Sequence, residues 1–362
     1  MSHTSRRAVL KAGAAALATA SVSRIARAAA AGVPGAPLKV GFVLPGPKDD
    51  GGWSEAHVRG ALAMKETFGD RVEITFVERI TAEPDAERVL RDLVRQGHKL
   101  IFLCSAGSPV YRVGTAHPEV LFEQCIADRL APNVGTYDIR THEAWAVCGT
   151  IAGLMTRTGK IGCVTSFPVP TVMLALNAFT IMARKVNPKL EVIPTWLSTF
   201  YDPARESDAA RALIAQGADI VLTHNDGPAV LQIDEQKGVY TFGLGKDMSR
   251  YAPKSQLSAV VYNWGVHYIR SVRKVLEGTW KPINSWPGMA DDAVRIAPYS
   301  AAVPPSVVSH AEEVRKAIVA GTLSPFDGPV TDNKGNLVIP SGKRLDGRDL
   351  LLERWFTAGV AG

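Results

Sequence analysis

The sequence predicts an α/β protein built from two doubly wound, Rossmann-like lobes joined by a hinge. Short apolar runs alternate with longer amphipathic stretches through short connections, which is the pattern of parallel α/β folds. The series then starts afresh at Lys160-Ile-Gly-Cys-Val-Thr-Ser166, a strand of the same character as Lys39 to Leu44. The length of 362 residues is enough for two domains of ordinary size.

The first series alternates strands and helices from residue 39 to residue 156. We expect strands at 39–44, 72–78, 99–105, 120–127 and 133–137, and helices at 54–68, 84–96, 109–116 and 141–156. Pro84 suits the first turn of its helix, because a proline there loses no intrahelical hydrogen bond. Gly97 suits the residue that ends the same helix.

The second series gives expected strands at 160–166, 191–198, 219–224 and 239–244, and helices at 169–186, 203–216 and 228–235. A further strand at 257–263 leads into a helix at 264–277 and is expected to return to the first lobe. The expected domains are therefore 38–157 plus 259–300 for lobe 1 and 158–258 for lobe 2.

Residues 301–362 form an expected C-terminal tail that packs on the lobes. Proline, glycine and isolated apolar residues dominate this part of the chain. It contains expected helices at 305–320 and 349–357, and Asp332-Asn-Lys-Gly335 has the composition of a hairpin turn.

Residues 1–30 have the features of a twin-arginine signal peptide. Ser5-Arg6-Arg7 precedes an alanine-rich stretch from Ala12 to Val22, and Ala26-Arg27-Ala28 or Ala28-Ala29-Ala30 supplies a small-residue cleavage site. The apolar stretch is too short to span a bilayer. The sequence thus predicts a protein exported to the periplasm, with no direct insertion into the membrane.

The charge of the chain is concentrated in this leader. The whole sequence carries a formal net charge of +6, and the leader holds five of its Lys and Arg residues and no acidic residue. Removing the leader therefore takes the net charge from +6 to +1. A nearly neutral domain without a basic patch is not expected to bind nucleic acid.

The four cysteines, Cys104, Cys125, Cys148 and Cys163, show neither CxxC nor zinc spacing. Free cysteines are common in protein cores, so we expect buried free thiols. A disulfide between Cys104 and Cys125 stays open as the alternative, because the expected compartment permits one.

Several enzyme motifs are missing from the sequence. It contains no GxxxxGK[ST] loop, no GxGxxG after a strand, no GxSxG elbow and no HExxH pair. No cofactor or metal site is expected, and the pattern favours a binding protein over an enzyme.

The loop Asp50-Gly51-Gly52-Trp53 follows the first strand and precedes the first helix. Ligands of open α/β sheets bind outside the carboxyl ends of the strands. The glycines allow close approach of the backbone to a ligand, and the indole of Trp53 offers a flat face for stacking. In the alternative interpretation, Trp53 packs beneath a neighbouring loop.

The other candidate ligand contacts also follow strands: Ser105, Phe167, Phe200, Tyr201, Asp226, Asp247, Asn263 and Trp264. Aromatic rings together with carboxylates and amides suit a flat heterocycle with polar edges. As alternatives, Phe167 and Tyr201 lie in the core, and Asp202 and Asp247 act as helix caps.

The chain resembles the basic membrane protein family of ABC-transporter substrate-binding proteins, and within it the Gly-Gly-Trp subgroup of relatives of purine-nucleoside receptors. The matching segments are 50–53, 84–88, 158–162, 166–168, 200–203, 216–219, 247–249, 263–265 and 325–329. The resemblance implies a type I periplasmic-binding-protein fold whose lobes close on a purine. It also implies an ABC permease in the inner membrane as partner.

In the nucleoside receptors of this family, an aromatic ring from each lobe sandwiches the base. The resemblance assigns these roles to Trp53 and to Phe200 or Tyr201, and a ribose contact to Asp247. Ser54 stands where nucleoside receptors carry a base-reading asparagine, and Asn263-Trp264 stands in place of a ribose-binding lysine. These departures indicate a free nucleobase such as adenine.

Three other functions remain open from the sequence. The same fold serves receptors for sugars, amides and other small polar solutes. The protein could also be a ligand-sensing subunit, or a nucleoside hydrolase.

Overall fold

The computed structural model describes residues 36–347 and 349–361. The predicted signal peptide at 1–30 lies outside the described residues. The chain forms two compact units, and each is described here by itself. Unit 1 contains the segment up to Asp49, His57–Ile139 and Trp264–Trp286; unit 2 contains Asp50–Ala56, Arg140–Asn263 and the segment from Pro287.

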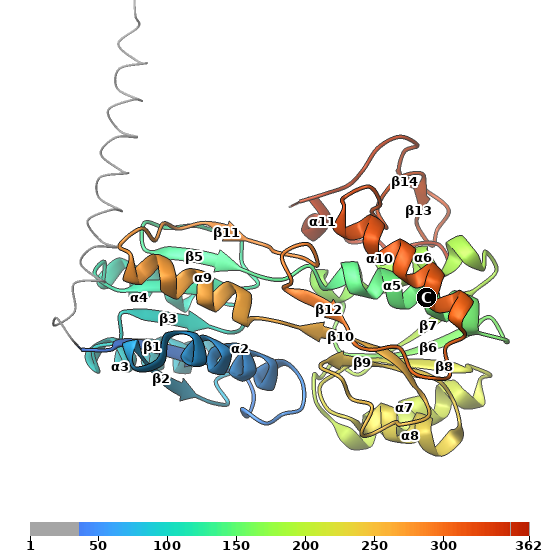
Figure 1. The fold of residues 1–362 in the computed structure, drawn as a ribbon, viewed down its shortest axis with the longest axis horizontal. Helices are drawn as coiled ribbons and strands as arrows, with labels where there is room; N and C mark the ends of the chain where they lie inside the picture. Colours follow the sequence, from blue (N-terminus) through green and yellow to red (C-terminus); the bar gives the residue numbers. More distant parts are fainter. Residues whose placement is uncertain (1–35, 348, 362) are drawn as a thin grey trace, which may run out of the picture. The chain divides into compact units, whose positions relative to one another are not determined.

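Unit 1 is built on a six-stranded sheet in the order β11-β5-β4-β3-β1-β2, and every pair of neighbours runs parallel (Figure 1). The strands are β1 (Leu38–Val43), β2 (Val72–Val77), β3 (Leu100–Leu103), β4 (Leu121–Cys125), β5 (Val134–Tyr137) and β11 (Asn284–Ser285). The strands β1, β3, β4 and β5 are almost entirely buried, as expected for a parallel sheet covered on both faces.

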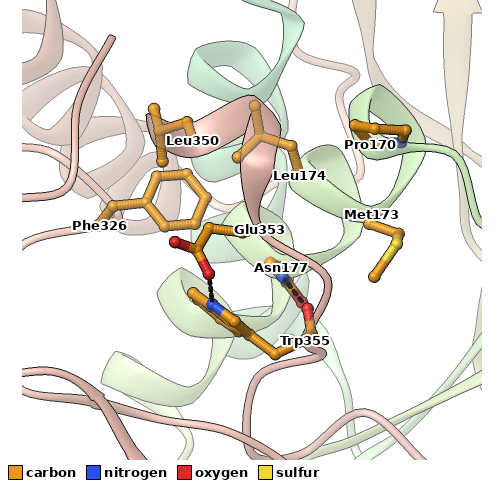
Figure 2. A pocket seen from close by; sticks show the side chains of 8 residues that line it. All are labelled: Pro170, Met173, Leu174, Asn177, Phe326, Leu350, Glu353 and Trp355. Atoms are coloured by element: carbon orange, nitrogen blue, oxygen red, sulfur yellow. Dashed lines mark hydrogen bonds between the residues drawn. The ribbon is translucent and has the colours of Figure 1, made fainter. Parts of the chain in front are cut away.

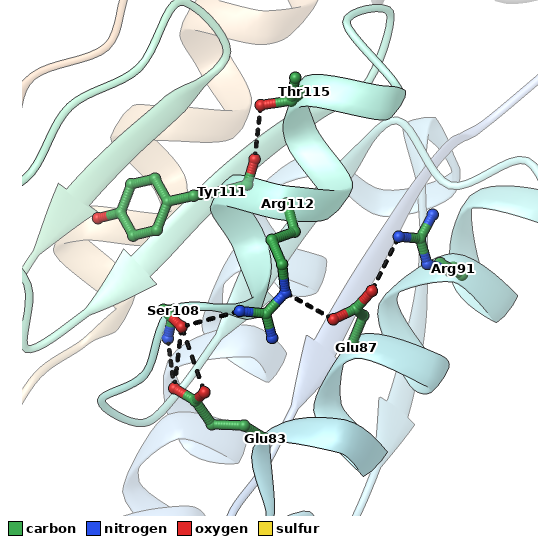
Figure 3. A network of polar contacts seen from close by, with 7 residues as sticks. All are labelled: Glu83, Glu87, Arg91, Ser108, Tyr111, Arg112 and Thr115. Carbon is green, nitrogen blue, oxygen red and sulfur yellow. Dashed lines mark hydrogen bonds and ion pairs between the residues drawn. The ribbon is translucent and has the colours of Figure 1, made fainter.

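The helices of unit 1 are α3 (Glu83–Arg95), α4 (Pro109–Ala116), α9 (Gly265–Leu276) and the part of α2 (Trp53–Phe68) from His57 onward, with a short 3-10 turn, η1 (Gly69–Arg71), before β2. Val89, Leu90 and Leu93 of α3 enter an apolar cluster with β1, β3 and α4. An exposed network joins α3 to α4, in which Arg112 Nε lies 2.7 Å from Glu87 Oε2, and the Ser108 backbone N–H donates to Glu83 (Figure 3). Such surface pairs add little to stability.

Unit 2 contains two three-stranded sheets, β7-β6-β8 and β12-β10-β9, and the small hairpin β13-β14. The strands are β6 (Lys160–Thr165), β7 (Glu191–Trp196), β8 (Ile220–His224), β9 (Thr241–Gly245), β10 (Gln256–Tyr262), β12 (Val294–Ile296), β13 (Val330–Thr331) and β14 (Leu337–Ile339). An isolated bridge between Ile220 and Tyr240 links β8 to the segment that enters β9.

The helices of unit 2 are α5 (Thr141–Met155), α6 (Pro170–Val186), α7 (Pro203–Ala215), α8 (Ala229–Lys237), α10 (Pro305–Val319) and α11 (Asp349–Leu352). Helix α5 packs tightly against α6. A Cβ atom at Gly149 of α5 would lie only 2.1 Å from the carbonyl oxygen of Phe179, so this approach requires glycine.

The unit boundaries differ from those expected from the sequence. The expected lobe 1 included residues 141–157 and 259–263, but α5 packs on α6 of unit 2, and β10 pairs with β9 in unit 2. The returning segment of unit 1 therefore begins at Trp264 and ends at Trp286. Helix packing decides the first of these boundaries and strand pairing the second, and sequence periodicity reports neither.

The C-terminal tail belongs to unit 2. The hairpin turn expected at 332–335 is confirmed, because the Asp332 carboxylate accepts from the backbone N–H of Lys334 and Asn336. The helix expected at 349–357 ends at Leu352. Beyond it, Asn177 of α6 donates to the carbonyl of Trp355 at 2.9 Å and accepts from the backbone N–H of Thr357, which holds this segment extended (Figure 2).

All four cysteines are buried free thiols, as expected. Burial raises the pKa of Cys104 and Cys163 to about 12, so these thiols stay protonated.

Candidate functional site

The loop from Asp50 to Trp53 begins helix α2 and lies in unit 2. The Asp50 carboxylate accepts from three backbone N–H groups, those of Gly52 at 2.9 Å, Ser54 at 2.9 Å and Glu55 at 3.0 Å. The Asp50 side chain therefore caps the start of this helix.

Asp226 follows β8, and its side chain also accepts from a backbone N–H at the start of α2. Its Oδ1 accepts from the backbone N–H of Trp53 at 2.8 Å. A Cβ atom at Gly52 would lie 2.0 Å from this oxygen, so only glycine lets the two loops approach this closely. Burial, followed by the neighbouring charge of Asp50, raises the pKa of Asp226 to about 8.

Glu206 of α7 adds a further acidic group near Asp226. It is fully buried and accepts from the backbone N–H of Asp202 at 2.8 Å. Burial raises the pKa of Glu206 to about 7. Asp202 itself accepts from the backbone N–H of Arg205, so the capping alternative for Asp202 is confirmed.

The indole of Trp53 is half-buried. Its ring meets the Tyr262 ring edge to face, with centroids 6.1 Å apart. Trp53 is thus neither fully buried nor fully exposed.

Three further aromatic rings lie at the ends of β6 and β7. Phe200 and Tyr201 are 48% and 55% exposed, which is unusual for rings of this size. The rings of Phe167 and Phe200 are tilted against each other, with centroids 5.2 Å apart. Tyr201 lies against Gly227, directly after Asp226. The alternative that placed Tyr201 in the core is therefore wrong, and the aromatic residues form an open patch.

A salt bridge that the sequence interpretation missed lies at the end of β9. Lys246 Nζ lies 2.5 and 2.6 Å from the two carboxylate oxygens of Glu55. Asp247 is exposed, and its Oδ1 accepts from Ser249 and from Gln256 Nε2. Asp247 therefore holds the turn after β9 and does not cap an α-helix.

Two other candidate residues, Asn263 and Ser105, form hydrogen bonds within the protein. The side-chain amide of Asn263 donates to the carbonyl of Asp292 at 2.8 Å. In unit 1, the carbonyl of Ser105 accepts from the side chain of Gln124.

Trp264 is fully buried in unit 1 and stacks on His57, with ring centroids 4.4 Å apart. This placement does not fit the expected ligand contact of Trp264, because the buried indole packs between α2 and α9. A tryptophan at the start of a helix gives no sequence signal that distinguishes these two roles.

The pocket shown in Figure 2 has a different character. Pro170, Leu174, Phe326 and Leu350 give it an apolar lining, and Glu353 accepts from the Trp355 indole. It lies where the tail packs on α6, and its lining residues hold the tail against this helix.

Residues 36–347 and 349–361 contain no cluster of three or more His, Cys, Asp or Glu that could hold a metal ion. No helix within this part of the chain is long and apolar enough to cross a membrane.

The model of the family described as "ABC transporter substrate-binding protein PnrA-like" (Bmp) matches residues 38–325. The chain belongs to the Bmp family. A purine-binding protein of Brucella abortus is 39% identical over 325 residues, covering 89% of this chain and 93% of that protein. A Haloferax volcanii protein named as an ABC transporter glucose-binding protein is 31% identical over 242 residues, covering 66% of this chain and 61% of its own length.

Solved structures agree on the fold of this Bmp-family protein. ABC transporter solute-binding proteins of Conexibacter woesei and Aeropyrum pernix superpose with TM-scores of 0.67 and 0.68, at 21% and 18% identity. They cover 79% and 80% of this chain, and 98% and 93% of their own lengths. The predicted fold class is therefore confirmed, and the resemblance read from the Gly-Gly-Trp loop is correct at the level of the family.

Proposed function

We propose that this Bmp-family protein is an exported receptor of an ABC importer and that it binds a purine base or nucleoside. The observation that carries the proposal is the patch of accessible aromatic rings beside Asp226 in unit 2. Phe200 and Tyr201 are about half exposed, and Trp53 is half-buried. Rings of this kind cost free energy in water unless a ligand or partner covers them.

The polar groups of the patch support a neutral ligand. The N–H groups at the start of α2 are already taken by Asp50 and Asp226. An anionic ligand would meet the Asp50 carboxylate, and these N–H groups would not be available to it. A purine base is uncharged at neutral pH and offers both a stacking face and hydrogen-bonding edges.

The relative from Brucella abortus, which is named a purine-binding protein, supports the same ligand class. The relative from Haloferax volcanii, which is named for glucose, favours a sugar as the second candidate. The twin-arginine features of residues 1–30 support export to the periplasm, where the receptor would deliver its ligand to a permease.

Thermal-shift measurements with adenine, hypoxanthine, adenosine and glucose test the proposal, because only a true ligand raises the melting temperature. We expect a rise with purines and none with glucose. Native mass spectrometry of the freshly purified protein would reveal a retained ligand directly. A rise with glucose alone would overturn the purine assignment, and release of free base from adenosine would indicate an enzyme.

The variant Trp53→Ala tests the stacking role. Loss of one stacking ring should weaken purine binding by about 1–3 kcal/mol, and Trp53→Phe should retain most of the affinity. Trp355→Ala is the matched control, because Trp355 is an equally half-buried tryptophan of unit 2 that packs in the tail. Unchanged affinity in Trp53→Ala would exclude Trp53 from the ligand site.

A further inference from the structure

A small cavity in unit 2 is lined by residues of α5, α6, β6 and β8. Trp145 of α5, Thr165 at the end of β6 and His224 at the end of β8 line one small cavity. Thr165 and His224 are direct neighbours in the parallel pairing of β6 with β8. The aromatic residue Phe167 and the carboxylate of Asp226 follow them two positions later, so cavity and patch share the same strand ends.

The polar atoms of this cavity lack protein partners. Thr165 and Trp145 are 0% and 2% exposed. Within the described residues, the Thr165 hydroxyl, the Trp145 indole N–H and His224 Nε2 have no hydrogen-bond partner. An unsatisfied buried polar group is destabilising, and native proteins contain few of them. Three around one cavity indicate that something else satisfies them.

The three groups differ in their hydrogen-bonding chemistry. An indole N–H can only donate, whereas a hydroxyl can donate and accept. Burial lowers the pKa of His224 to about 4, so its imidazole is neutral and offers one donor and one acceptor. The ring of His224 is stacked on that of Trp145, with centroids 5.7 Å apart, which fixes both rings at the cavity.

The size of the cavity limits its occupant. The cavity has room for about one atom of the size of a water oxygen. The rest of the lining is apolar, with Cys163, Leu176, Phe179 and Leu222. A whole base does not fit, but an exocyclic atom at the edge of a base does.

We propose that Trp145, Thr165 and His224 form a specificity subsite that receives the hydrogen-bonding edge of the purine. This inference rests on the proposed function and deepens it. To satisfy these groups, the edge of the ligand must carry a hydrogen-bond donor next to an acceptor. Adenine presents them as its amino group and a ring nitrogen, and hypoxanthine as its carbonyl oxygen and a ring N–H. Unsubstituted purine lacks the exocyclic atom.

The test compares variants against these three ligands by isothermal titration. Thr165→Val removes the hydroxyl and keeps the shape, and His224→Phe removes the ring nitrogens and keeps the stacked ring. Each variant should bind adenine or hypoxanthine about five- to tenfold more weakly, the value of one neutral hydrogen bond. Binding of unsubstituted purine should change by less than about twofold.

The control is Thr150→Val. Thr150 is another fully buried threonine of unit 2, but its hydroxyl donates to the carbonyl of Ala146 at 3.1 Å. Thr150→Val should lose stability and keep its ligand preference, whereas Thr165→Val should keep its stability without ligand.

Two negative outcomes are distinguishable. Equal weakening of all three ligands, or no weakening, would overturn the subsite even though the wild-type protein binds purines. Failure of the wild-type protein to bind any of the three would instead overturn the proposed function.

Discussion

The variant Asp226→Asn should change how the stability of the protein depends on pH. Asp226 Oδ1 accepts from the Trp53 backbone N–H at 2.8 Å, and the asparagine oxygen can accept from the same group. The substitution therefore keeps the hydrogen bond and the volume. What it removes is a carboxyl group that burial makes difficult to ionise.

The sign and size of the effect follow from the pKa. The pKa of Asp226 is about 8 in the folded protein, against 3.8 as the ordinary value. The folded state then holds a proton that the unfolded chain has released. This contribution to stability is fully present below pH 4 and is lost as the pH rises towards 8. One proton corresponds to about 1.4 kcal/mol per pH unit.

Urea unfolding of both proteins at pH 5, 6 and 7 measures this difference. Asp226→Asn should gain stability relative to wild type as the pH rises, by at most about 3 kcal/mol between pH 5 and pH 7. Other titrating groups, including Glu206, are present in both proteins and largely cancel in the comparison.

Asp247→Asn is the matched control. At Asp247 burial favours the neutral acid, but hydrogen bonds from Ser249 and Gln256 outweigh it and lower the pKa. Its substitution should therefore give no gain with rising pH. A stability difference between Asp226→Asn and wild type that stays constant from pH 5 to pH 7 would refute the assignment of a raised pKa to Asp226.

Three substitutions test the packing around the site. Gly52→Ala places a methyl group against the Asp226 carboxylate and should cost about 1–3 kcal/mol in urea unfolding; wild-type stability would show that the two loops do not touch. Trp264→Ala should lower the free energy of unfolding by about 3–5 kcal/mol, and the folded protein should bind purine normally. Weaker purine binding would show that Trp264 contacts the ligand. Asn177→Leu removes two hydrogen bonds to the tail, so limited proteolysis should cut near Trp355 sooner than in wild type, and an unchanged digestion pattern would contradict this anchor.

The helices, the strands and the family could be predicted from the sequence, because they depend on local patterns of residues. Apolar runs of strand length located β1, β6 and β8 to within a residue or two, since a parallel strand must be apolar along its length when both faces are buried. The loop from Asp50 to Trp53 marked the family, because its glycines and its indole are adjacent in the chain. Five basic residues and no acidic one marked residues 1–30 as the predicted leader.

Only the tertiary structure shows which distant residues are in contact. Asp226 and Trp53 are 173 positions apart, and neither segment predicts that the Asp226 carboxyl accepts from the Trp53 backbone N–H. Trp264 and Trp53 carry the same side chain, yet Trp264 is fully buried and stacks on His57, whereas Trp53 is only half-buried. The assignment of α5 to unit 2 depends on a helix contact through Gly149. Burial and hydrogen bonding depend on which residues surround a side chain in the folded protein. Sequence patterns could therefore propose the candidate site residues, but they could not show which of them are buried or hold a loop.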